Sequence, residues 1–237
     1  MTVFTFPTTD ASNLKASNTE HDMRPNARIE ALLREVRGPE ILHVGCVGHK
    51  VAESAAELAH FFHHQLCLSF AGGNVLGIDI DRVGLARMEA MGFRVAIGDA
   101  QNLNFNSRFD TIVAGELIEH LQNPGAFLQG VARGLKPGGR LVLSTPNVFS
   151  VMLNLMFWKN SDHAFNPEHA LWFCPQTLRE ILRRCGFLID KLEFVDDLEP
   201  NLSPSRWYHA FARVWMATHS VVPTRFRNTM VAVCRLA

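Results

Sequence analysis

The sequence lacks an excess of charge of either sign. Lysine plus arginine and aspartate plus glutamate number 23 each among the 237 residues, so the formal net charge is zero. Proteins that bind nucleic acid or an anionic membrane through their overall field carry a clear basic excess. We therefore expect no DNA partner. The balance also disfavours RNA, although it does not exclude a nucleotide-type ligand.

Cysteine is scarce, and no Cys-x-x-Cys pair is present. The five cysteines are odd in number and widely spaced. Disulfide frameworks and structural zinc sites need paired or closely spaced cysteines. The pattern favours reduced thiols and a cytoplasmic location, and it argues against a zinc site built from cysteines.

Long apolar runs are also missing, although a helix needs about 20 such residues to span a bilayer. The longest candidate, Val148–Trp158, is interrupted by Ser150 and Asn154. The first 18 residues lack the basic start and apolar core of a signal peptide. We therefore expect no stable membrane insertion. With 47% hydrophobic and 19% charged residues, the composition is that of an ordinary globular protein.

Short apolar runs alternate with helical stretches along most of the chain. This alternation predicts an α/β fold, namely a doubly wound, Rossmann-like, mostly parallel seven-stranded sheet with helices on both faces. Right-handed crossovers then bring the strand ends to one edge, where ligands bind. The expected strands are 41–45, 75–80, 93–97, 109–114, 141–144, 187–194 and 229–234, and the expected helices are 25–37, 50–68, 81–91, 124–135, 175–185 and 206–220.

We expect one domain preceded by a flexible arm. The arm would be residues 1–23, which are rich in Thr, Ser and Asn at their start, and the domain would be 24–237. Within the domain, 24–147 would bind a cofactor, whereas 148–237 would form a lid segment on the acceptor side and the C-terminal strands. The sequence does not indicate an oligomeric state.

A glycine-containing turn follows the first expected strand, in the run I-L-H-V-G-C-V-G-H-K from Ile41 to Lys50. Gly45 and Gly48 let the backbone turn sharply and approach a ligand, and a helix that follows offers unpaired N–H groups. The next expected strand ends in Asp79, which can accept hydrogen bonds from both hydroxyls of a ribose. The pattern therefore indicates a site for a nucleotide-type cofactor.

Further motifs follow in a fixed order: G-I-D at 77–79, G-D-A-Q-N-L at 98–103, F-D-T-I-V-A-G-E-L-I-E-H-L at 109–121 and L-K-P-G-G-R-L-V-L-S-T-P-N at 135–147. As a set they resemble the class I S-adenosylmethionine-dependent methyltransferases, in the branch of the ubiquinone-biosynthesis O-methyltransferases. The resemblance covers about residues 41–190 and implies S-adenosylmethionine as cofactor.

The resemblance also implies a role for individual residues. Asp79 would hold the ribose hydroxyls and Asp99 the adenine amino group. Both aspartates also have a purely structural interpretation, as helix or turn caps. Other positions matching cofactor contacts are Ile80 and Ala100 beside the adenine, Gly45, Cys46 and Gly48 along the methionine and ribose, and Gly115 closing that side.

The glycine loop departs from the D-x-G-x-G-x-G pattern that is frequent in this family. His43 stands in place of the acid, Val47 in place of the middle glycine and His49 in place of the last. Because Val47 carries a Cβ, we expect the loop to hold the cofactor differently from an all-glycine loop.

Glu116, Glu119 and His120 are the strongest candidates for chemistry. Methyl transfer needs an acceptor in line with the methyl group, and a base or metal that lowers the acceptor's pKa. Spacings of three and four residues place these side chains on one helical face, and two carboxylates plus an imidazole can bind a divalent ion. In the ubiquinone-type and small-RNA 2′-O-methyltransferases, a similar E-x-x-E-H resembles a magnesium site. The alternative is that these residues only cap and brace a short helix.

A further ligand from downstream would complete such a Mg²⁺ site, and Asn147, His163 and His169 are the options. His163 and His169 lie in the segment expected to fold over the site, and either can act as a general base near neutral pH. We therefore select His120, His169 and Glu116 as candidate catalytic residues.

The leading hypothesis is methyl transfer from S-adenosylmethionine to a small-molecule acceptor, at an oxygen of a phenol, quinone precursor, sugar or secondary metabolite. One alternative is an RNA 2′-O-methyltransferase, which the neutral charge disfavours. The other is a non-catalytic Rossmann-like module that binds a partner, suggested by the altered glycine loop. Retention of both Asp79 and Asp99 speaks against the second alternative.

Overall fold

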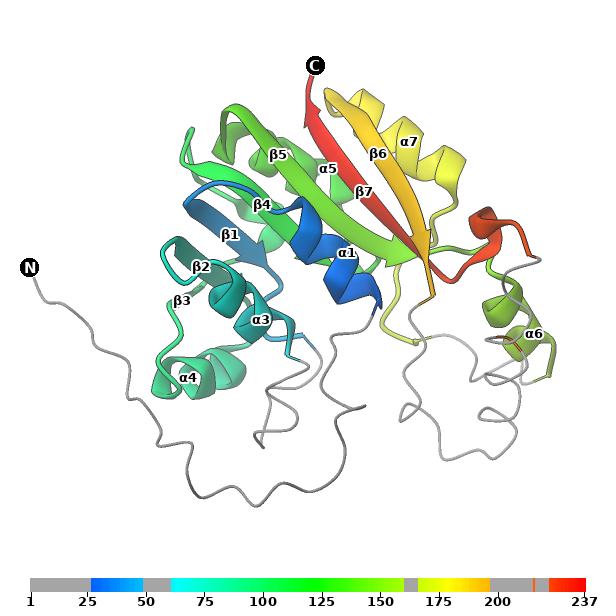
Figure 1. Ribbon diagram of the computed structural model, residues 1–237, viewed down its shortest axis with the longest axis horizontal. Coiled ribbons are helices and arrows are strands. Elements are labelled where there is room, and N and C mark those ends of the chain that lie inside the picture. Colours follow the sequence, from blue (N-terminus) through cyan, green and yellow to red (C-terminus); the bar gives the residue numbers. More distant parts are fainter. Residues whose placement is uncertain (1–26, 49–60, 160–165, 197–214, 216–221) are drawn as a thin grey trace, which may run out of the picture.

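The computed structural model describes residues 27–48, 61–159, 166–196, 215 and 222–237, and Figure 1 shows their arrangement. A single seven-stranded sheet has the order β3-β2-β1-β4-β5-β7-β6. The pairs from β3 through β5 are parallel, and β7 runs antiparallel to both of its neighbours. The strands are β1 (Glu40–Val44), β2 (Asn74–Asp79), β3 (Val95–Ile97), β4 (Phe109–Gly115), β5 (Leu135–Pro146), β6 (Phe187–Val195) and β7 (Thr229–Leu236).

Helices cover both faces of the sheet, as the alternating pattern predicts. In Figure 1, α1 and α3 lie in front of the sheet, whereas α5 and α7 lie behind it. Among the described residues, no helix has the length and apolar character needed to cross a membrane. The helices are α1 (Ala27–Glu35), α3 (Phe62–Ser69), α4 (Arg82–Ala90), α5 (Pro124–Gly134), α6 (Val151–Lys159) and α7 (Pro175–Arg184), with short 3-10 helices η2 (Ala100–Asn102), η3 (Ile118–His120) and η5 (Thr224–Phe226).

Apolar side chains fill the space on each side of the sheet. Phe127 of α5 and Leu178 of α7 pack with Phe109 of β4 in the larger cluster. Leu32 of α1 and Leu66 of α3 pack against the opposite face. Burial of this apolar surface stabilises the fold by about 25 cal/mol per Å², and it fixes the strand ends that carry the site.

Two elements differ from the sequence prediction. The helix expected over 50–68 is not continuous, because Phe61 has an extended conformation and α3 begins at Phe62. The fifth strand was expected at 141–144, yet β5 begins at Leu135. Leu135 is buried and pairs with Phe109, and the register shift that follows accommodates the Pro-Gly-Gly residues within the strand. The helix expected at 206–220 lies outside the described residues except for Trp215.

Candidate functional site

A cleft of about 460 Å³ opens at the carboxyl ends of the parallel strands. This volume is within the usual range for small-molecule sites. The cleft lies where right-handed crossovers were expected to place it. Its lining comes from the ends of the parallel strands β1 to β4, from the segments that follow them and from the segment that begins at residue 166. The lining residues are Val44, Gly45, Gly48, Asp79, Ile80, Gly98, Asp99, Ala100, Gln101, Leu117, His120, Leu121, Gln122 and Glu168.

The glycine loop forms the turn that the sequence indicated. Gly45 and Gly48 both have positive φ angles, of 76° and 63°, which side-chain-bearing residues rarely adopt. The backbone N–H groups of Gly45 and Cys46 both donate to the Ile78 carbonyl, at 2.9 and 3.2 Å. The loop is therefore tied to the end of β2, beside the acid that follows.

The side chains of Val47 and Cys46 point away from the cleft. Both are buried in a small cluster with Leu85 and Met88. A Cβ added to Gly84 of α4 would lie 2.4 Å from Val47 Cγ1, so the valine occupies space that the glycine leaves. Val47 therefore does not present its Cβ to the cleft, contrary to our interpretation of the altered loop. Cys46 does not belong to the cleft lining.

Asp79 closes the loop through its carboxylate. Its Oδ2 accepts a hydrogen bond from the Val47 N–H at 2.9 Å, and its Oδ1 accepts one from the Asp81 N–H at 3.0 Å. Each carboxylate oxygen has a second lone pair, so the side chain keeps acceptor capacity toward the cleft that it lines. Asp99, like Asp79, has a structural role and also faces the cleft. It caps η2 by accepting a hydrogen bond from the Gln101 N–H, and it lines the cleft.

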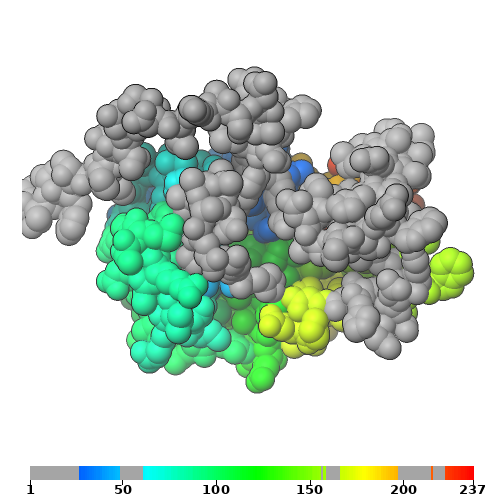
Figure 2. All heavy atoms as spheres, turned by 90° about the horizontal axis from the view of Figure 1, so that it is seen from below, coloured from blue at the N-terminus to red at the C-terminus, as the bar shows by residue number. Residues whose placement is uncertain are grey.

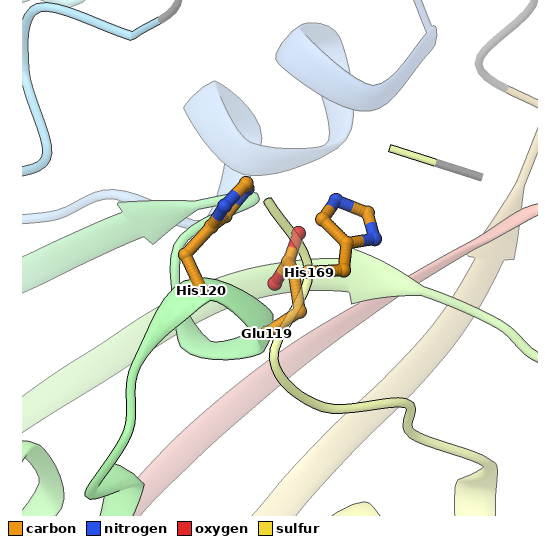
Figure 3. A group of neighbouring side chains, drawn as sticks. All are labelled: Glu119, His120 and His169. Atoms are coloured by element: carbon orange, nitrogen blue, oxygen red, sulfur yellow. The ribbon is translucent and has the colours of Figure 1, made fainter. Parts of the chain in front are cut away.

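Three titratable side chains converge at the other end of the site. Glu119 and His120 come from η3, and His169 comes from the segment that begins at residue 166 (Figure 3). One ligand atom from each lies within 4.8 Å of the other two. The rings of His120 and His169 meet edge to face, with their centroids 4.7 Å apart. In the space-filling view, the segment that begins at residue 166 reaches the surface as the yellow patch (Figure 2).

Backbone hydrogen bonds hold this segment against η3. The N–H groups of Ala170 and Leu171 both donate to the Glu119 carbonyl at 2.9 Å. Farther along, Phe173 forms an isolated parallel bridge with Asn147 at the end of β5. These contacts, and not sequence proximity, bring His169 to His120.

The Glu119 side chain is buried in a position that favours its neutral form. Burial, followed by repulsion from the nearby Glu116 carboxylate, raises the pKa of Glu119 to about 9. Thr145 Oγ1 donates a hydrogen bond to Glu119 Oε2 at 2.9 Å. The other oxygen, Oε1, has no hydrogen-bond partner among the described residues. In the ion-free protein, Glu119 is therefore protonated at neutral pH.

Glu116 and Gly115 lie at the end of β4 but outside the cleft lining. Glu116 has a positive φ of 49°, and its N–H donates to the backbone carbonyl and the hydroxyl of Ser144. A Cβ on Gly115 would face α1, 3.3 Å from Arg28 Nη1. Glu116 does not share a helical face with Glu119 and His120, because η3 begins only at Ile118. Gly115, expected beside the cofactor, does not line the cleft.

Of the proposed further ligands, only His169 joins the cluster. The Asn147 side-chain amide instead donates to the carbonyls of Arg225 and Arg227, at 2.9 Å each. His163 lies outside the described residues. Two charged residues at the site were not predicted from the sequence: Glu168 lines the cleft, and Arg28 acts electrostatically on Glu119. The other lining residues that were not predicted are Val44, Gly98, Gln101, Leu117, Leu121 and Gln122. Glu168 adjoins the selected His169, whereas no motif marks Arg28.

The sequence matches the family model described as "Methyltransferase domain" over residues 17–192, most of the chain. The chain belongs to this methyltransferase family. The family implies S-adenosylmethionine as the methyl donor, and the cleft lies at the sheet edge where our motif analysis placed that cofactor. Membership also confirms the resemblance from which the analysis proceeded.

Several curated relatives are similar over about half to two thirds of the chain. A probable S-adenosylmethionine-dependent methyltransferase of Mycolicibacterium smegmatis is 27% identical over 164 residues, which are 68% of this chain and 56% of the relative. The ubiquinone biosynthesis O-methyltransferase of Xanthomonas euvesicatoria is 32% identical over 121 residues, which are 48% of this chain and 45% of that protein. The chain thus spans about half the length of these relatives.

Solved structures confirm the Rossmann-like fold. A methyltransferase of Archaeoglobus fulgidus matches with a TM-score of 0.59 and 19% identity, covering 88% of this chain and 91% of that one. Phosphoethanolamine N-methyltransferase 2 of Haemonchus contortus, solved with S-adenosylmethionine, matches with a TM-score of 0.57 and 18% identity, covering 87% of this chain and 51% of that one. At this identity the likeness concerns the fold alone.

Proposed function

We propose that the protein transfers the methyl group of S-adenosylmethionine to an oxygen atom of a small molecule, such as a phenol, a quinone precursor, a sugar or a secondary metabolite. The observation that carries the proposal is the position of His120, which lines the same cleft as Asp79 and Asp99. An imidazole there can take the proton that a hydroxyl loses as it attacks the methyl group. Similarity to relatives named as O-methyltransferases supports oxygen as the acceptor atom.

In this proposal the cofactor lies along the cleft from Asp99 to His120. Asp79 accepts from the ribose hydroxyls with the lone pairs that the loop amides leave, and Ile80 and Ala100 pack beside the adenine. Ile80 is 71% exposed, so its side chain is accessible for packing against the flat adenine ring. The acceptor then approaches from the side of His120 and Glu168.

Within the cluster, we assign the proton transfer to His120 and an orienting role to His169. His120 lines the cleft, whereas His169 is absent from that lining and meets His120 edge to face. Glu116 acts through its neighbour, because its carboxylate raises the pKa of Glu119. The roles of the two histidines differ because His120 lines the cleft in which the acceptor would bind, whereas His169 does not.

The cluster also fits a divalent ion. Oε1 of Glu119 is a buried acceptor that lacks a hydrogen-bond partner among the described residues. One ligand atom each of Glu119, His120 and His169 lies within 4.8 Å of the other two. Glu119, His120 and His169 would hold the ion, which would lower the pKa of an acceptor hydroxyl. His120 would then be a ligand, so its role in proton transfer belongs to the ion-free protein. Two imidazoles and one carboxylate suit zinc, manganese or iron, whereas magnesium prefers oxygen ligands. The expected magnesium therefore stays a prediction to be tested against these ions.

The test starts with calorimetric titration of S-adenosylmethionine and S-adenosylhomocysteine, with and without divalent ions. We expect micromolar binding, followed by methyl transfer to a catechol-type probe acceptor. His120→Ala should lower turnover at least about a hundredfold, as expected for loss of a general base, while product affinity stays within about threefold. His64→Ala, on α3 away from the cleft, is the matched control. Absence of binding would favour the non-catalytic module instead.

A further inference from the structure

A second histidine pair lies buried beneath the glycine loop, outside the cleft. His43 of β1 and His63 of α3 are 3% and 0% exposed. Their Nδ1 atoms are 3.1 Å apart, and the rings stack with an interplanar angle of 15°. His43 is the residue that replaces the acid of the family pattern, so the pair arises at a position where this chain departs from its relatives.

The fold provides a fitted space for the second ring. Gly77 of β2 pairs directly with His43 in the sheet register. A Cβ on Gly77 would lie 2.8 Å from His63 Cε1 and 2.7 Å from Cys46 Sγ, so only a glycine leaves room for the imidazole and the thiol. Phe93 closes the far side, with its ring centroid 5.3 Å from that of His63.

The short contact defines the protonation state of both rings. Two facing Nδ1 atoms form a hydrogen bond only when one carries a proton and the other does not. If the accepting ring gained a proton, two N–H groups would face each other in a buried space. The bond therefore needs one Nδ1–H and one free Nδ1 lone pair, and when both imidazoles are neutral the two rings have opposite tautomers. It is lost when both Nδ1 atoms carry a proton.

The surroundings oppose protonation of either ring. Burial, together with His63 and Arg28 of α1, holds the pKa of His43 well below its ordinary value of 6.5. Burial and His64 lower the pKa of His63 to about 4. Cys46, which follows β1, stays neutral because burial raises its pKa to about 12. Among the described residues, these are the titratable and charged groups that face the pair.

We infer that the His43–His63 pair positions the cofactor loop by fixing α3 to β1, two residues before Gly45, and that its protonation releases this contact in acid. The inference rests on the proposed function only for the identity of the ligand whose binding weakens. In this inference, His43, which stands at the position of the family acid, makes the loop sensitive to pH.

The sign of the effect follows from linkage. The closed state keeps both rings unprotonated, whereas an opened state binds protons below about pH 6.5. Each histidine then favours opening by up to about tenfold per pH unit, and the pair by up to about a hundredfold. The effect extends downward until the closed state itself takes a proton, near pH 4 for His63.

The pair can be tested directly in the unmodified protein. Nitrogen-15 NMR of the histidine rings, followed from pH 7.5 to 5, should show two imidazoles that stay neutral, one protonated on Nδ1 and the other on Nε2. His43→Gln and His63→Gln assign the two signals. Two Nε2–H tautomers, or titration of both rings near pH 6.5, would overturn the inference.

A second experiment measures the consequence for the loop. The double variant with His43→Leu and His63→Phe removes both titrating groups and keeps apolar packing, whereas Ser69→Ala, an exposed position at the end of α3, is the control on the same helix. Hydrogen exchange of the α3 and β1 amides should lose protection in acid up to about a hundredfold per pH unit in the wild type and control, but not in the double variant. Parallel behaviour of all three proteins would refute the inference.

Affinity for S-adenosylhomocysteine should stay constant from pH 7.5 to 5, where both rings are neutral, and should fall between pH 5 and 4 in the wild type and the control but not in the double variant. If the wild type binds no cofactor product even at pH 7.5, the proposed function fails, yet the NMR and exchange measurements still decide on the pair. If it binds and its affinity falls equally in the double variant, the inference about the pair fails while the proposed function stands.

Discussion

Replacing Asp79 by alanine is the most direct test of where the cofactor lies. The carboxylate lies at the end of β2 and lines the cleft, so its removal takes away a ligand contact and not a core side chain. We expect Asp79→Ala to abolish measurable binding of S-adenosylmethionine and S-adenosylhomocysteine while the protein still folds.

The magnitude can be estimated from the hydrogen bonds. Two bonds from ribose hydroxyls to a carboxylate contribute about 1.5–3 kcal/mol each, so affinity should fall by roughly 10²–10⁴. The same change leaves the Val47 N–H, now donating to Asp79 Oδ2, without its acceptor. An unsatisfied buried N–H costs about 1–3 kcal/mol of stability, which a domain of ordinary stability survives.

The assay combines calorimetry with chemical denaturation. Asp81→Ala is the matched control, because Asp81 caps α4 by accepting from the Val83 N–H and is absent from the cleft lining. It should lose about 1 kcal/mol of stability and keep its affinity within about threefold. Unchanged affinity in a folded Asp79→Ala protein would show that the cofactor lies elsewhere.

Three further changes test other parts of the site. Burial raises the pKa of Glu119 to about 9, so the stability of the wild type should fall as pH rises above about 4.5, the pKa in the unfolded chain. In chemical denaturation, the free energy of unfolding should drop from pH 5.5 to 8 by up to about 3 kcal/mol more in the wild type than in Glu119→Gln. Val47→Gly should lose about 2–4 kcal/mol of stability without tightening cofactor binding, because a buried contact with α4 disappears; tighter binding would contradict the orientation of Val47. His169→Ala should weaken binding of zinc or manganese by at least about tenfold in calorimetry, and equal affinity would exclude His169 as a ligand.

The parallel half of the sheet was predictable because β1, β2 and β4 are buried along most of their length. Continuous apolar runs such as those of β1 and β2 are stable in the buried interior of a parallel sheet. The glycines and aspartates at the ends of these strands mark the edge of the sheet where ligands bind. The start of α3 at Phe62 was not predictable, since apolar residues at helical spacing continue through the extended Phe61. The contact of this helix with β1 joins His63 to His43, a residue 20 positions earlier, and sequence spacing does not show it.

The cofactor end of the site was also more predictable than the chemical end. Asp79 and Asp99 directly follow or end strands, so their place is set by local sequence. The Glu119, His120 and His169 cluster instead depends on two backbone hydrogen bonds to the Glu119 carbonyl. Sequence spacing suggested Glu116 as the third member, because it assumed a regular helix where the chain has a positive φ at Glu116 and a 3-10 turn after it.

The altered glycine loop shows how a family motif can change without losing its site. Both departures in the described part of the loop are matched by a glycine on a neighbouring element: Val47 fills the space left by Gly84, and the His63 ring that pairs with His43 lies over Gly77. The changed side chains therefore occupy the protein side of the loop, while Gly45 and Gly48 still line the cleft. Because Gly77 and Gly84 have no room for a Cβ, Gly77→Ala or Gly84→Ala should disturb the loop from behind, weakening cofactor binding without altering a single cleft-lining residue.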